Sequence, residues 1–458
     1  MLTEGTIIAL STAAGQGAIA VLRLSGSKAI TTVDRLFKAR SGKPLNTQKS
    51  HTVHLGDLMD KQSVVDEVLV TLFKGPHSYT GEDVVEISCH GSVFIQEKIL
   101  RLFLDHGIQA AQPGEFTLRA FVNGKMDLSQ AEAVSDLIAS ENAASHAIAL
   151  QQMRGGFSDE IKKLREQLLN FASLIELELD FAEEDVAFAD REAFIALLKK
   201  IESLLKHLLD SFALGNVLKK GVPVAIVGPP NAGKSTLLNA LLNEDKAIIS
   251  AIAGTTRDSI EDEITLDGIA FRFIDTAGIR ETEDVVEKIG IQKTFEKLEN
   301  AAFVFYLIDS TDKAQHQAAA EALAKINTQY PDKPLLVVWN KMDKTKDFTP
   351  PNDTHYPSLA ISAKEQTSID ALQKHLVDYF QQQNYSDQTV LSNARHYGAL
   401  NAALGEIIKV QQGIDDHLSS DLLAIDLRQA LYHLGEITGE VTNDELLGNI
   451  FSKFCIGK

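Results

Sequence analysis

The spacing of apolar residues changes twice along the chain and divides it into regions. Near the N-terminus, apolar or alternating runs of strand length lie at residues 7–10, 18–22, 68–73 and 84–88. Residues 94–104 have the spacing of a helix, and segments containing glycine and proline separate these elements. The pattern predicts a mixed α/β region over residues 1–118.

Long amphipathic helices are predicted next, because apolar residues then recur at intervals of three and four positions. In residues 119–216 they include Ile161, Leu164, Leu168, Ile175, Leu179, Phe194, Leu197, Ile201, Leu204, Leu208 and Phe212. In residues 381–458 they include Leu400, Leu404, Ile407, Ile408, Leu423, Leu427, Leu431 and Leu434. Thr442 and Glu445 have the spacing of a capping box for a last short helix.

Between these helical regions the pattern becomes strand–loop–helix. Apolar runs of strand length lie at residues 224–227, 271–274, 303–308, 335–338 and 359–361. Helical stretches separate several of them, which predicts a mostly parallel sheet covered on both faces. The most economical architecture is an α/β domain, residues 217–380, inserted into one helical domain. Two separate helical domains are the alternative.

The composition is that of a folded protein rather than a disordered or fibrous one. The 458 residues suggest roughly two to four domains, and 44% are hydrophobic and 23% charged. Cys89 and Cys455 are the two cysteines, which argues against a disulfide framework and favours a reducing cytoplasm. Neither a membrane-spanning run nor the basic start of a signal peptide is present in the sequence.

Charge limits how the protein could bind nucleic acid. Acidic residues outnumber basic residues by 63 to 44, for a net charge of -19. This balance argues against a protein that coats nucleic acid by bulk electrostatic attraction. RNA binding through a local basic patch or through a partner stays open.

Residues 228–235, Gly-Pro-Pro-Asn-Ala-Gly-Lys-Ser, match the phosphate-binding P-loop pattern between a predicted strand and helix. Gly228 and Gly233 have the backbone freedom that lets successive amides turn toward phosphate. Lys234 is expected to reach the β- and γ-phosphates, and the Ser235 hydroxyl to bind Mg²⁺. A chance match is the alternative, which the motifs that follow make untenable.

Two of these further motifs concern the γ-phosphate. Asp275, which begins Asp-Thr-Ala-Gly after a predicted strand, can hold Mg²⁺ through water, and the Gly278 amide can contact the γ-phosphate. Thr256 lies in a segment placed where a switch loop belongs and is the candidate second protein ligand of Mg²⁺.

Two others concern the base. Asp343, in Asn-Lys-Met-Asp, can accept hydrogen bonds from both N1–H and the 2-amino group of guanine. Adenine offers no such pair of donors, so this motif selects GTP over ATP. The segment Ser362-Ala363-Lys364 can supply an amide to the guanine O6. Together the five motifs resemble the translation-factor-related class of GTPases.

Two positions depart from the Ras-like pattern. Ile279 stands where Ras-like proteins carry the glutamine that orients water, and an aliphatic side chain cannot do this. Asn231 is similar to the asparagine with which potassium-dependent GTPases hold a monovalent cation, which can replace an arginine finger. An ordinary turn residue is the alternative reading of Asn231.

Motifs outside the GTPase region extend the resemblance to the whole chain. They are Leu22-Arg23-Leu24-Ser25-Gly26, Thr80-Gly81-Glu82-Asp83, Pro113-Gly114-Glu115-Phe116 and the terminal Phe454-Cys455-Ile456-Gly457-Lys458. With the GTPase motifs, they resemble the family of tRNA modification GTPases called MnmE or TrmE. The terminal cysteine-containing motif is much more specific than a P-loop.

This resemblance implies a fold and an activity. The fold is an N-terminal α/β domain, residues 1–118, that binds tetrahydrofolate and dimerises, a discontinuous helical domain, residues 119–216 and 381–458, and an inserted G domain. The activity, with the flavoprotein MnmG (GidA), adds an aminomethyl or carboxymethylaminomethyl group to carbon 5 of the wobble uridine of certain tRNAs. A reduced folate, 5-formyl- or 5,10-methylene-tetrahydrofolate, donates the carbon, and glycine or ammonium the nitrogen.

The resemblance also implies residue roles. Family folate contacts map onto Arg23, Glu86, Lys125 and Lys458; a carboxylate suits the pterin donor edge, and cations suit the folate tail. Cys455 is the candidate catalytic thiol, and packing is the alternative. Plain surface charges are the alternative for the folate set. A Cys89–His90 pair is disfavoured, because adjacent residues of a strand face opposite sides.

In the G domain, the resemblance implies a potassium site and a catalytic acid. Potassium ligands map onto Asn231, Ser250, Thr255 and, through its carbonyl, Ile252, and the catalytic glutamate onto Glu287. A helix-surface acid paired with lysine is the alternative for Glu287. The full expected nucleotide and cation set is Asn231, Ala232, Gly233, Lys234, Ser235, Thr236, Ser250, Ala251, Ile252, Ala253, Gly254, Thr255, Thr256, Asp275, Thr276, Ala277, Gly278, Asn340, Lys341, Met342, Asp343, Ser362, Ala363 and Lys364.

Two competing functions use the same GTPase motifs. A ribosome-assembly or RNA-binding GTPase without modification chemistry would usually carry an RNA-binding module such as a KH domain. Here the C-terminal region is helical and more acidic than basic. A septin-like or dynamin-like assembling GTPase is the other alternative, but neither a repeat nor a long coiled coil is present in the sequence.

Overall fold

The computed structural model describes residues 5–180, 191–244, 262–274, 298–345, 348–351, 355–381 and 390–458. The chain forms two compact units. Unit 1 contains Met1–Ala139, Ala149–Leu205 and Gly398–Lys458, and unit 2 contains Ser140–Ile148 and Lys206–Tyr397. Among the described helices, none combines the length and apolar character needed to cross a membrane.

Unit 1 begins with a seven-stranded sheet in the order β3-β4-β5-β6-β2-β1-β7. Its strands are β1 (Ile7–Leu10), β2 (Ile19–Ser25), β3 (Phe37–Ala39), β4 (Thr52–Asp60), β5 (Ser63–Phe73), β6 (Val84–His90) and β7 (Gln109–Ala110). Helices α1 (Ala29–Leu36) and α2 (Val93–Asp105) pack on one face of this sheet, and η1 (Leu45–Thr47) lies against α1. Because side chains alternate along a strand, Leu22 and Leu24 enter this core while Arg23, between them, lies on the other face.

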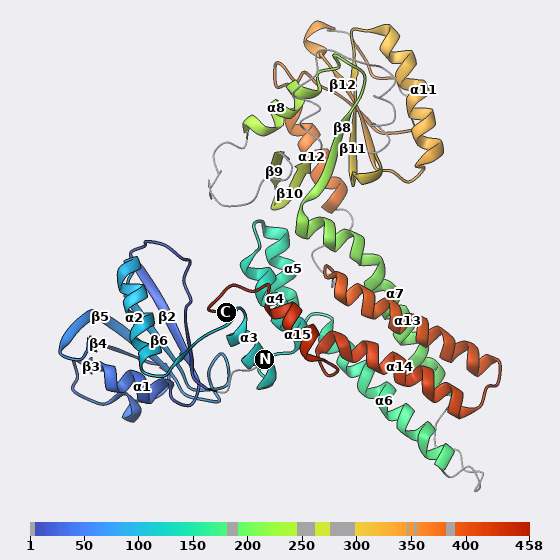
Figure 1. The fold of residues 1–458 in the computed structure, drawn as a ribbon. Coiled ribbons are helices and arrows are strands. Elements are labelled where there is room, and N and C mark those ends of the chain that lie inside the picture. The colour runs from blue at the N-terminus through green and yellow to red at the C-terminus, as the bar shows by residue number, and fades with distance from the viewer. Residues whose placement is uncertain are drawn as a thin grey trace. The chain divides into compact units, whose positions relative to one another are not determined.

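The helical part of unit 1 is built from segments on both sides of the inserted domain. It includes α3 (Glu115–Val122), α4 (Leu128–Ile138), α6 (Ser158–Asp180), α14 (Ser420–Thr438) and α15 (Asp444–Phe451). Helix α14 packs along α6, where Arg165 Nε donates to the Leu431 carbonyl at 3.2 Å, and it also contacts α4 (Figure 1). The prediction of one discontinuous helical domain is therefore confirmed. Helices α5 (Ala143–Met153), α7 (Arg191–Lys220) and α13 (Ala394–Asp415) contribute residues to both units.

Unit 2 contains the predicted mostly parallel sheet, in the order β13-β12-β11-β8-β10-β9. The strands are β8 (Val222–Val227), β9 (Asp262–Leu266), β10 (Ile269–Phe273), β11 (Phe303–Asp309), β12 (Leu335–Asn340) and β13 (Ser358–Ala360). Only the β9–β10 pair is antiparallel among these described strands. Helices α8 (Lys234–Glu244) and α12 (Ile369–Gln381) cover one face, and α11 (Lys313–Gln329) covers the other.

The N-terminus of α15 differs from the sequence prediction. The helix is capped by Asn443, whose side chain accepts a hydrogen bond from the Leu446 amide at 2.7 Å. The predicted capping box of Thr442 and Glu445 is wrong by one position. The cause is that asparagine and threonine both cap helices well, so two adjacent candidates cannot be ranked from sequence spacing alone.

Candidate functional site

The GTPase motifs of unit 2 meet at one edge of the sheet. Strands β8, β11, β12 and β13 are parallel, so their carboxyl ends lie at the same edge. The P-loop follows β8, Asp309 ends β11, Asn340 ends β12, and Ser362 follows β13. In open α/β sheets, ligands bind in the crevice outside these carboxyl ends.

The P-loop backbone has the conformation that its glycines were predicted to provide. Gly228 has φ of 144° and Gly233 has φ of 97°. A Cβ atom on Gly228 would lie 2.2 Å from the Leu307 carbonyl oxygen, and one on Gly233 would lie 2.3 Å from Asn340 Nδ2. Asn231 has φ of 60°, in the left-handed region that asparagine tolerates better than most residues.

Side chains hold the carbonyl groups of five consecutive P-loop residues. Lys234 Nζ donates to the carbonyls of Gly228 and Pro229, each at 2.9 Å. The carbonyls of residues 230, 231 and 232 accept from Gln315 Nε2, Lys341 Nζ and Asn340 Nδ2 at 3.4, 2.6 and 2.9 Å. Carbonyls held in this way leave the loop amides available for phosphate.

The base-reading segments are tied to each other and to the P-loop. Asn340 Oδ1 accepts from the Ala363 amide at 3.0 Å, and Ser362 Oγ donates to Asp343 Oδ1 at 2.7 Å. Asp343 lies in the short helix η3 (Met342–Lys344) and is exposed, so its carboxylate is accessible to a base. Lys364, which directly follows the buried Ala363, is exposed as well.

The structure thus brings together the predicted residues of three segments, 231–236, 340–343 and 362–364. Ser235 and Thr236 are exposed in the first turn of α8. The remaining predicted residues of this site lie outside the described residues. They are Ser250, Ala251, Ile252, Ala253, Gly254, Thr255, Thr256, Asp275, Thr276, Ala277, Gly278 and Glu287. Ile279, the position that departs from the Ras-like pattern, also lies outside the described residues.

Asp309 is a residue at this site that the sequence analysis missed. It is 6% exposed, and its Oδ2 lies 2.6 Å from Lys341 Nζ. Burial alone would raise the pKa of Asp309, but hydrogen bonds from Lys341 and Thr311 outweigh it, so the pKa is lowered from its ordinary value. Its signal in the sequence was a carboxylate directly after the apolar run 303–308.

A second cluster lies in unit 1, on the face of the N-terminal sheet opposite α1 and α2. Arg23 of β2 lies directly across from Glu86 of β6. Arg23 Nε and Nη2 both contact Glu86 Oε1, at 2.9 and 2.8 Å. The guanidinium also lies 5.4 Å from the Tyr79 ring and 5.8 Å from the Phe116 ring. The side chains are 17% and 26% exposed, so a ligand can reach the pair.

Lys125 is connected to this cluster through the loop that carries Tyr79. Lys125 Nζ donates to the Pro76 carbonyl at 3.0 Å, and its aliphatic part packs against Gly81. Tyr79 lies between these two positions in sequence, and its hydroxyl is 2.8 Å from Thr117 Oγ1. Arg23, through Tyr79, and Lys125, through Pro76 and Gly81, therefore contact the same loop.

The C-terminal segment lies against the same domain. Phe454 packs with Phe451 in a cluster that includes residues of α3 and α4. The Cys455 carbonyl accepts from the Gly114 amide at 3.5 Å, and the Gly457 carbonyl accepts from Ser11 Oγ at 3.2 Å. Figure 1 shows the C-terminus beside α3. Gly457 of this segment lies against the end of β1, the strand in which Ala9 pairs with Arg23 of β2.

The two cysteines differ sharply in environment. Cys89 is 3% exposed, and its thiol lies 3.6 Å from the Ala20 carbonyl. Burial, assisted by Asp66, raises the pKa of Cys89 to about 11, so this thiol stays protonated at neutral pH. Cys455 is exposed, two residues before the tightly packed Gly457. Only Cys455 of the two is accessible to a substrate.

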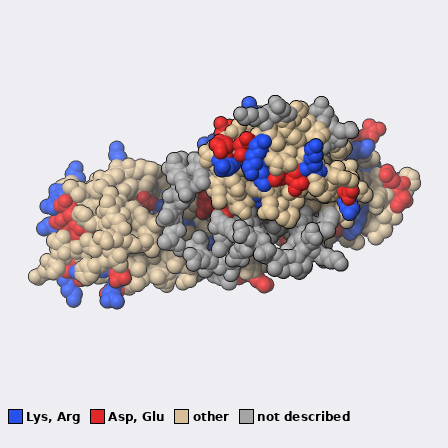
Figure 2. Space-filling view, turned by 90° about the horizontal axis from the view of Figure 1, so that it is seen from above, with Lys and Arg blue, Asp and Glu red and all other residues tan. Residues whose placement is uncertain are grey.

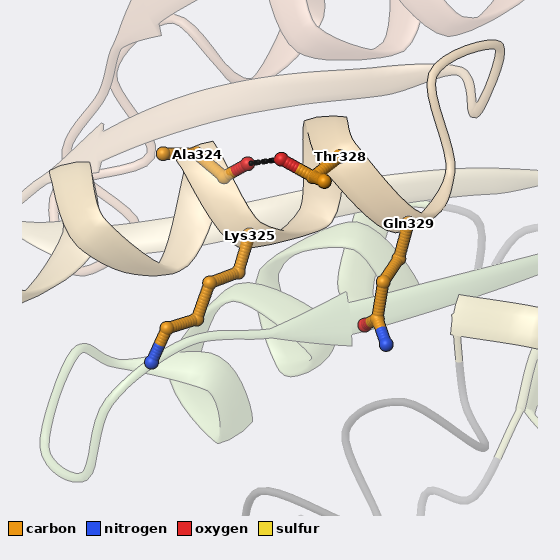
Figure 3. Close-up of a pocket in the computed structure, with 4 residues that line it drawn as sticks. All are labelled: Ala324, Lys325, Thr328 and Gln329. Atoms are coloured by element: carbon orange, nitrogen blue, oxygen red, sulfur yellow. Dashed lines mark hydrogen bonds between the residues drawn. The ribbon is translucent and has the colours of Figure 1, made fainter.

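Two further surface features, the distribution of charge and a hollow along α11, do not point to another functional site. Figure 2 shows acidic and basic side chains interspersed on the face in view rather than gathered by sign. The hollow in Figure 3 lies along the end of α11 and is lined by Ala324, Lys325, Thr328 and Gln329. Since α11 begins at the edge with the P-loop, its end lies at the opposite edge of the sheet.

Comparison with known proteins covers the entire chain. The model of the GTP-binding protein TrmE N-terminus matches residues 6–125, and that of the MnmE helical domain matches residues 128–455. A tRNA modification GTPase MnmE of Flavobacterium psychrophilum is 60% identical over 100% of both chains. Those of Christiangramia forsetii and Bacteroides fragilis are 57% and 51% identical, again over 100% of both chains.

One solved structure is similar to part of the chain. The G domain of the T. maritima FeoB iron transporter covers 34% of this chain and 98% of its own length. Its identity is 22% and its TM-score is 0.26, too low to bear on the fold.

Proposed function

The chain belongs to the MnmE family of tRNA modification GTPases, and from that membership we propose the reaction that it serves. It binds and hydrolyses GTP, with Mg²⁺, in tRNA modification. We propose that with MnmG it adds an aminomethyl or carboxymethylaminomethyl group to carbon 5 of the wobble uridine. The observation that supports this most is the full-length match of a chain that itself carries both the G motifs and the terminal Cys-Ile-Gly-Lys.

The folate site in this proposal is the cluster around Arg23. Both contacts of Arg23 use one oxygen of Glu86, so the second oxygen, Oε2, is available to the donor edge of a pterin. The rings of Tyr79 and Phe116 provide apolar surface beside the charges. Lys125 and Lys458 are the cations proposed for the acidic tail of folate. The bound folate would supply the one-carbon unit.

Cys455 is proposed as the thiol that works beside that folate. Its exposure and its place in the segment that packs on Gly114 and Ser11 support this role. Cys89 is unsuited, because its buried thiol has a raised pKa. A thiol acts as a nucleophile through its thiolate, so the accessible cysteine is the better candidate.

The potassium site is proposed at Asn231, with Ser250, Ile252 and Thr255. The Asn231 carbonyl already accepts from Lys341, so the side-chain amide is the part of Asn231 that a cation could use. Ser235 and Thr256 are the proposed Mg²⁺ ligands. GTP turnover should be fast in potassium chloride and slow in sodium chloride at equal ionic strength, and equal rates would reject the potassium site.

The partners in this proposal are a second copy of the chain, MnmG and tRNA. The mixed charges on the face shown in Figure 2 do not form a basic field for tRNA, which is consistent with contact through a local patch or through MnmG. GTP hydrolysis would drive association and release of the G domains rather than the carbon chemistry.

Reconstitution tests the proposal directly. The purified chain, MnmG with its flavin, GTP, potassium, ammonium and tRNA are mixed with 5,10-methylene-tetrahydrofolate labelled with ¹³C in the methylene group. The label is expected in the methylene carbon that becomes attached to carbon 5 of the wobble uridine. Transfer of the label without the chain, or failure of transfer with every component active in its own assay, would contradict the proposal.

Folate binding is tested separately by equilibrium binding of 5-formyl-tetrahydrofolate. Alanine variants of Arg23, Glu86 and Lys125 are each expected to weaken it, and Lys98→Ala, a partly exposed lysine of α2 on the covered side of the sheet, is the matched control. If all three variants bind folate like the wild type, the proposed contacts are wrong.

A further inference from the structure

We propose that Asp309 is a positioning residue for guanine nucleotide binding, which fixes the Lys341 ammonium between the guanine-reading segment and the P-loop. Lys341 Nζ lies 2.6 Å from Asp309 Oδ2 and donates to the Asn231 carbonyl at 2.6 Å. The ammonium of Lys341 therefore joins the end of β11 to the middle of the P-loop. Lys341 itself lies two residues before Asp343 in the sequence.

The carboxylate of Asp309 is itself held in one orientation. Its second oxygen, Oδ1, accepts from the Thr311 amide at 2.9 Å and from Thr311 Oγ1 at 2.7 Å. The side chain is 9% exposed, and that of Lys341 is 27% exposed. A fixed and largely buried carboxylate restricts the long lysine side chain, whose rotamer freedom would otherwise oppose any single geometry.

The backbone of Asp309 provides a second connection to the same loop. Its amide donates to Gln315 Oε1 at 3.4 Å, and Gln315 Nε2 donates to the Pro230 carbonyl at 3.4 Å. The neighbouring carbonyls of Pro230 and Asn231 are therefore both held by side chains anchored at Asp309. These bonds fix the orientation of the peptide groups on either side of Asn231, the residue with φ of 60°.

A change at Asp309 should accordingly act on nucleotide binding through Lys341. Asparagine at position 309 keeps the size of the side chain but removes the charge, so the ammonium loses its fixed partner. The Lys341 side chain can then adopt several conformations, and only some of them keep its hydrogen bond to the Asn231 carbonyl. The predicted cost is about a tenfold loss of GDP affinity, the size expected for one charge-assisted hydrogen bond.

A double-mutant cycle tests whether the effect passes through Lys341. Fluorescent GDP is titrated into the full chain as wild type, Asp309→Asn, Lys341→Met and the double variant. Asp309→Asn alone is expected to weaken GDP about tenfold, but by less than twofold in the Lys341→Met background. A role in folding alone would not produce this dependence. Independent, multiplying losses, or an unchanged affinity for Asp309→Asn, would overturn the proposal.

Controls separate this result from other causes. Asp332→Asn changes an exposed acid before β12, at the opposite edge of the sheet, and should bind GDP like the wild type. If Asp309→Asn does not fold, Thr311→Val replaces it in the cycle, with about a threefold loss expected only when Lys341 is present. Sodium buffer without potassium makes the result independent of the proposed potassium site.

Discussion

The nucleotide site and the Arg23 cluster are assembled in opposite ways. In the nucleotide site, each contributing segment is a short loop after a parallel strand, and the sheet brings the loops together. In the N-terminal domain, Arg23 and Glu86 come from two antiparallel strands, and the C-terminal segment arrives from the far end of the chain. The hydrogen bond between Ser11 and Gly457 joins positions 446 residues apart.

This difference separates chemistry that is local in sequence from chemistry that depends on the whole unit. The P-loop is held by its own backbone and by the side chains of Gln315, Asn340 and Lys341, all of which belong to unit 2. The proposed folate site, which adds the C-terminal segment to the Arg23 cluster, would also need the helical domain, because α15 leads into the segment that packs on Gly114. Changes in the tail should therefore affect folate and spare GTP, whereas changes in the G motifs should do the reverse.

The largest expected effect is at Glu287, within the locally encoded site. Because Ile279 cannot orient water, Glu287→Ala should reduce single-turnover GTP hydrolysis in potassium by about 10²-fold or more, the range for loss of a general base. GTP affinity should change little, because the group acts in the transition state. Rapid-quench kinetics measure both quantities.

Nearby acids provide the controls for Glu287. Replacement of Glu281, Glu283 or Asp284 by alanine should have milder effects on the same rate. Hydrolysis by Glu287→Ala at the wild-type rate would assign the role to another residue.

Asp343→Asn should have the next largest effect, on binding rather than hydrolysis. It replaces one acceptor oxygen by an NH2 donor and removes the charge, so the two guanine donors lose their shared carboxylate, which costs roughly 1–3 kcal/mol, or about ten- to a hundredfold in GTP affinity. Xanthine nucleotides should bind better to the variant than to the wild type. Calorimetry with GTP and XTP measures both, and unchanged GTP affinity would remove Asp343 from the site. Folate binding should be unaffected.

Gly457→Ala tests the non-local site in the same way. Gly457 has φ of 95°, and a Cβ atom there would lie 2.2 Å from the Leu10 carbonyl oxygen, so the tail must move. We expect about a tenfold loss of folate affinity, as for one displaced charge-assisted contact, with GTP affinity unchanged. Ser452→Ala, an exposed position of the same tail, is the control. Normal folate binding by Gly457→Ala would show that the tail position is unimportant.

The smallest expected effect is at the start of α15. Asn443→Ala removes the side chain that caps this helix and should cost about 1 kcal/mol, whereas Thr442→Ala should be close to neutral. Calorimetry should show a thermal midpoint lowered by about 2–4 °C for Asn443→Ala alone. If Thr442→Ala were the more destabilised variant, the capping box of Thr442 and Glu445 that the sequence predicted would be supported instead.

The two sheets also differ in how many of their strands could be predicted from the sequence. The five predicted strands of the G domain all exist. Strands β8, β10, β11 and β12 are largely buried apolar runs, which is the pattern expected inside a mostly parallel sheet, whereas the edge strand β13 is only partly buried. The sequence did not predict strands β3, β4 and β7 of the N-terminal sheet, nor strand β9 of the second sheet. Strand β4 has exposed Val53 and Leu55 near its start and Gly56 in its middle, so its alternation is weak.

Site residues follow the same division. The nucleotide motifs could be located because fixed local spacing carries their chemistry. The pairing of Arg23 with Glu86, and the rings of Tyr79 and Phe116 beside it, depend on strand register and on a loop, neither of which spacing reveals. Asp309 was missed for a related reason, since a single acid at a strand end gains meaning only when its partner Lys341 is known.

We propose that the nucleotide site and the Arg23 cluster serve one reaction on tRNA. Mass spectrometry of wobble nucleosides tests it in a deletion strain that carries wild type, Arg23→Ala, Asp343→Asn or the control Asp332→Asn. The deletion should lack the aminomethyl-type substituent, wild type and Asp332→Asn should restore it, and Arg23→Ala and Asp343→Asn should not. Intact substituents in the deletion strain, or full restoration by either site variant, would contradict the claim.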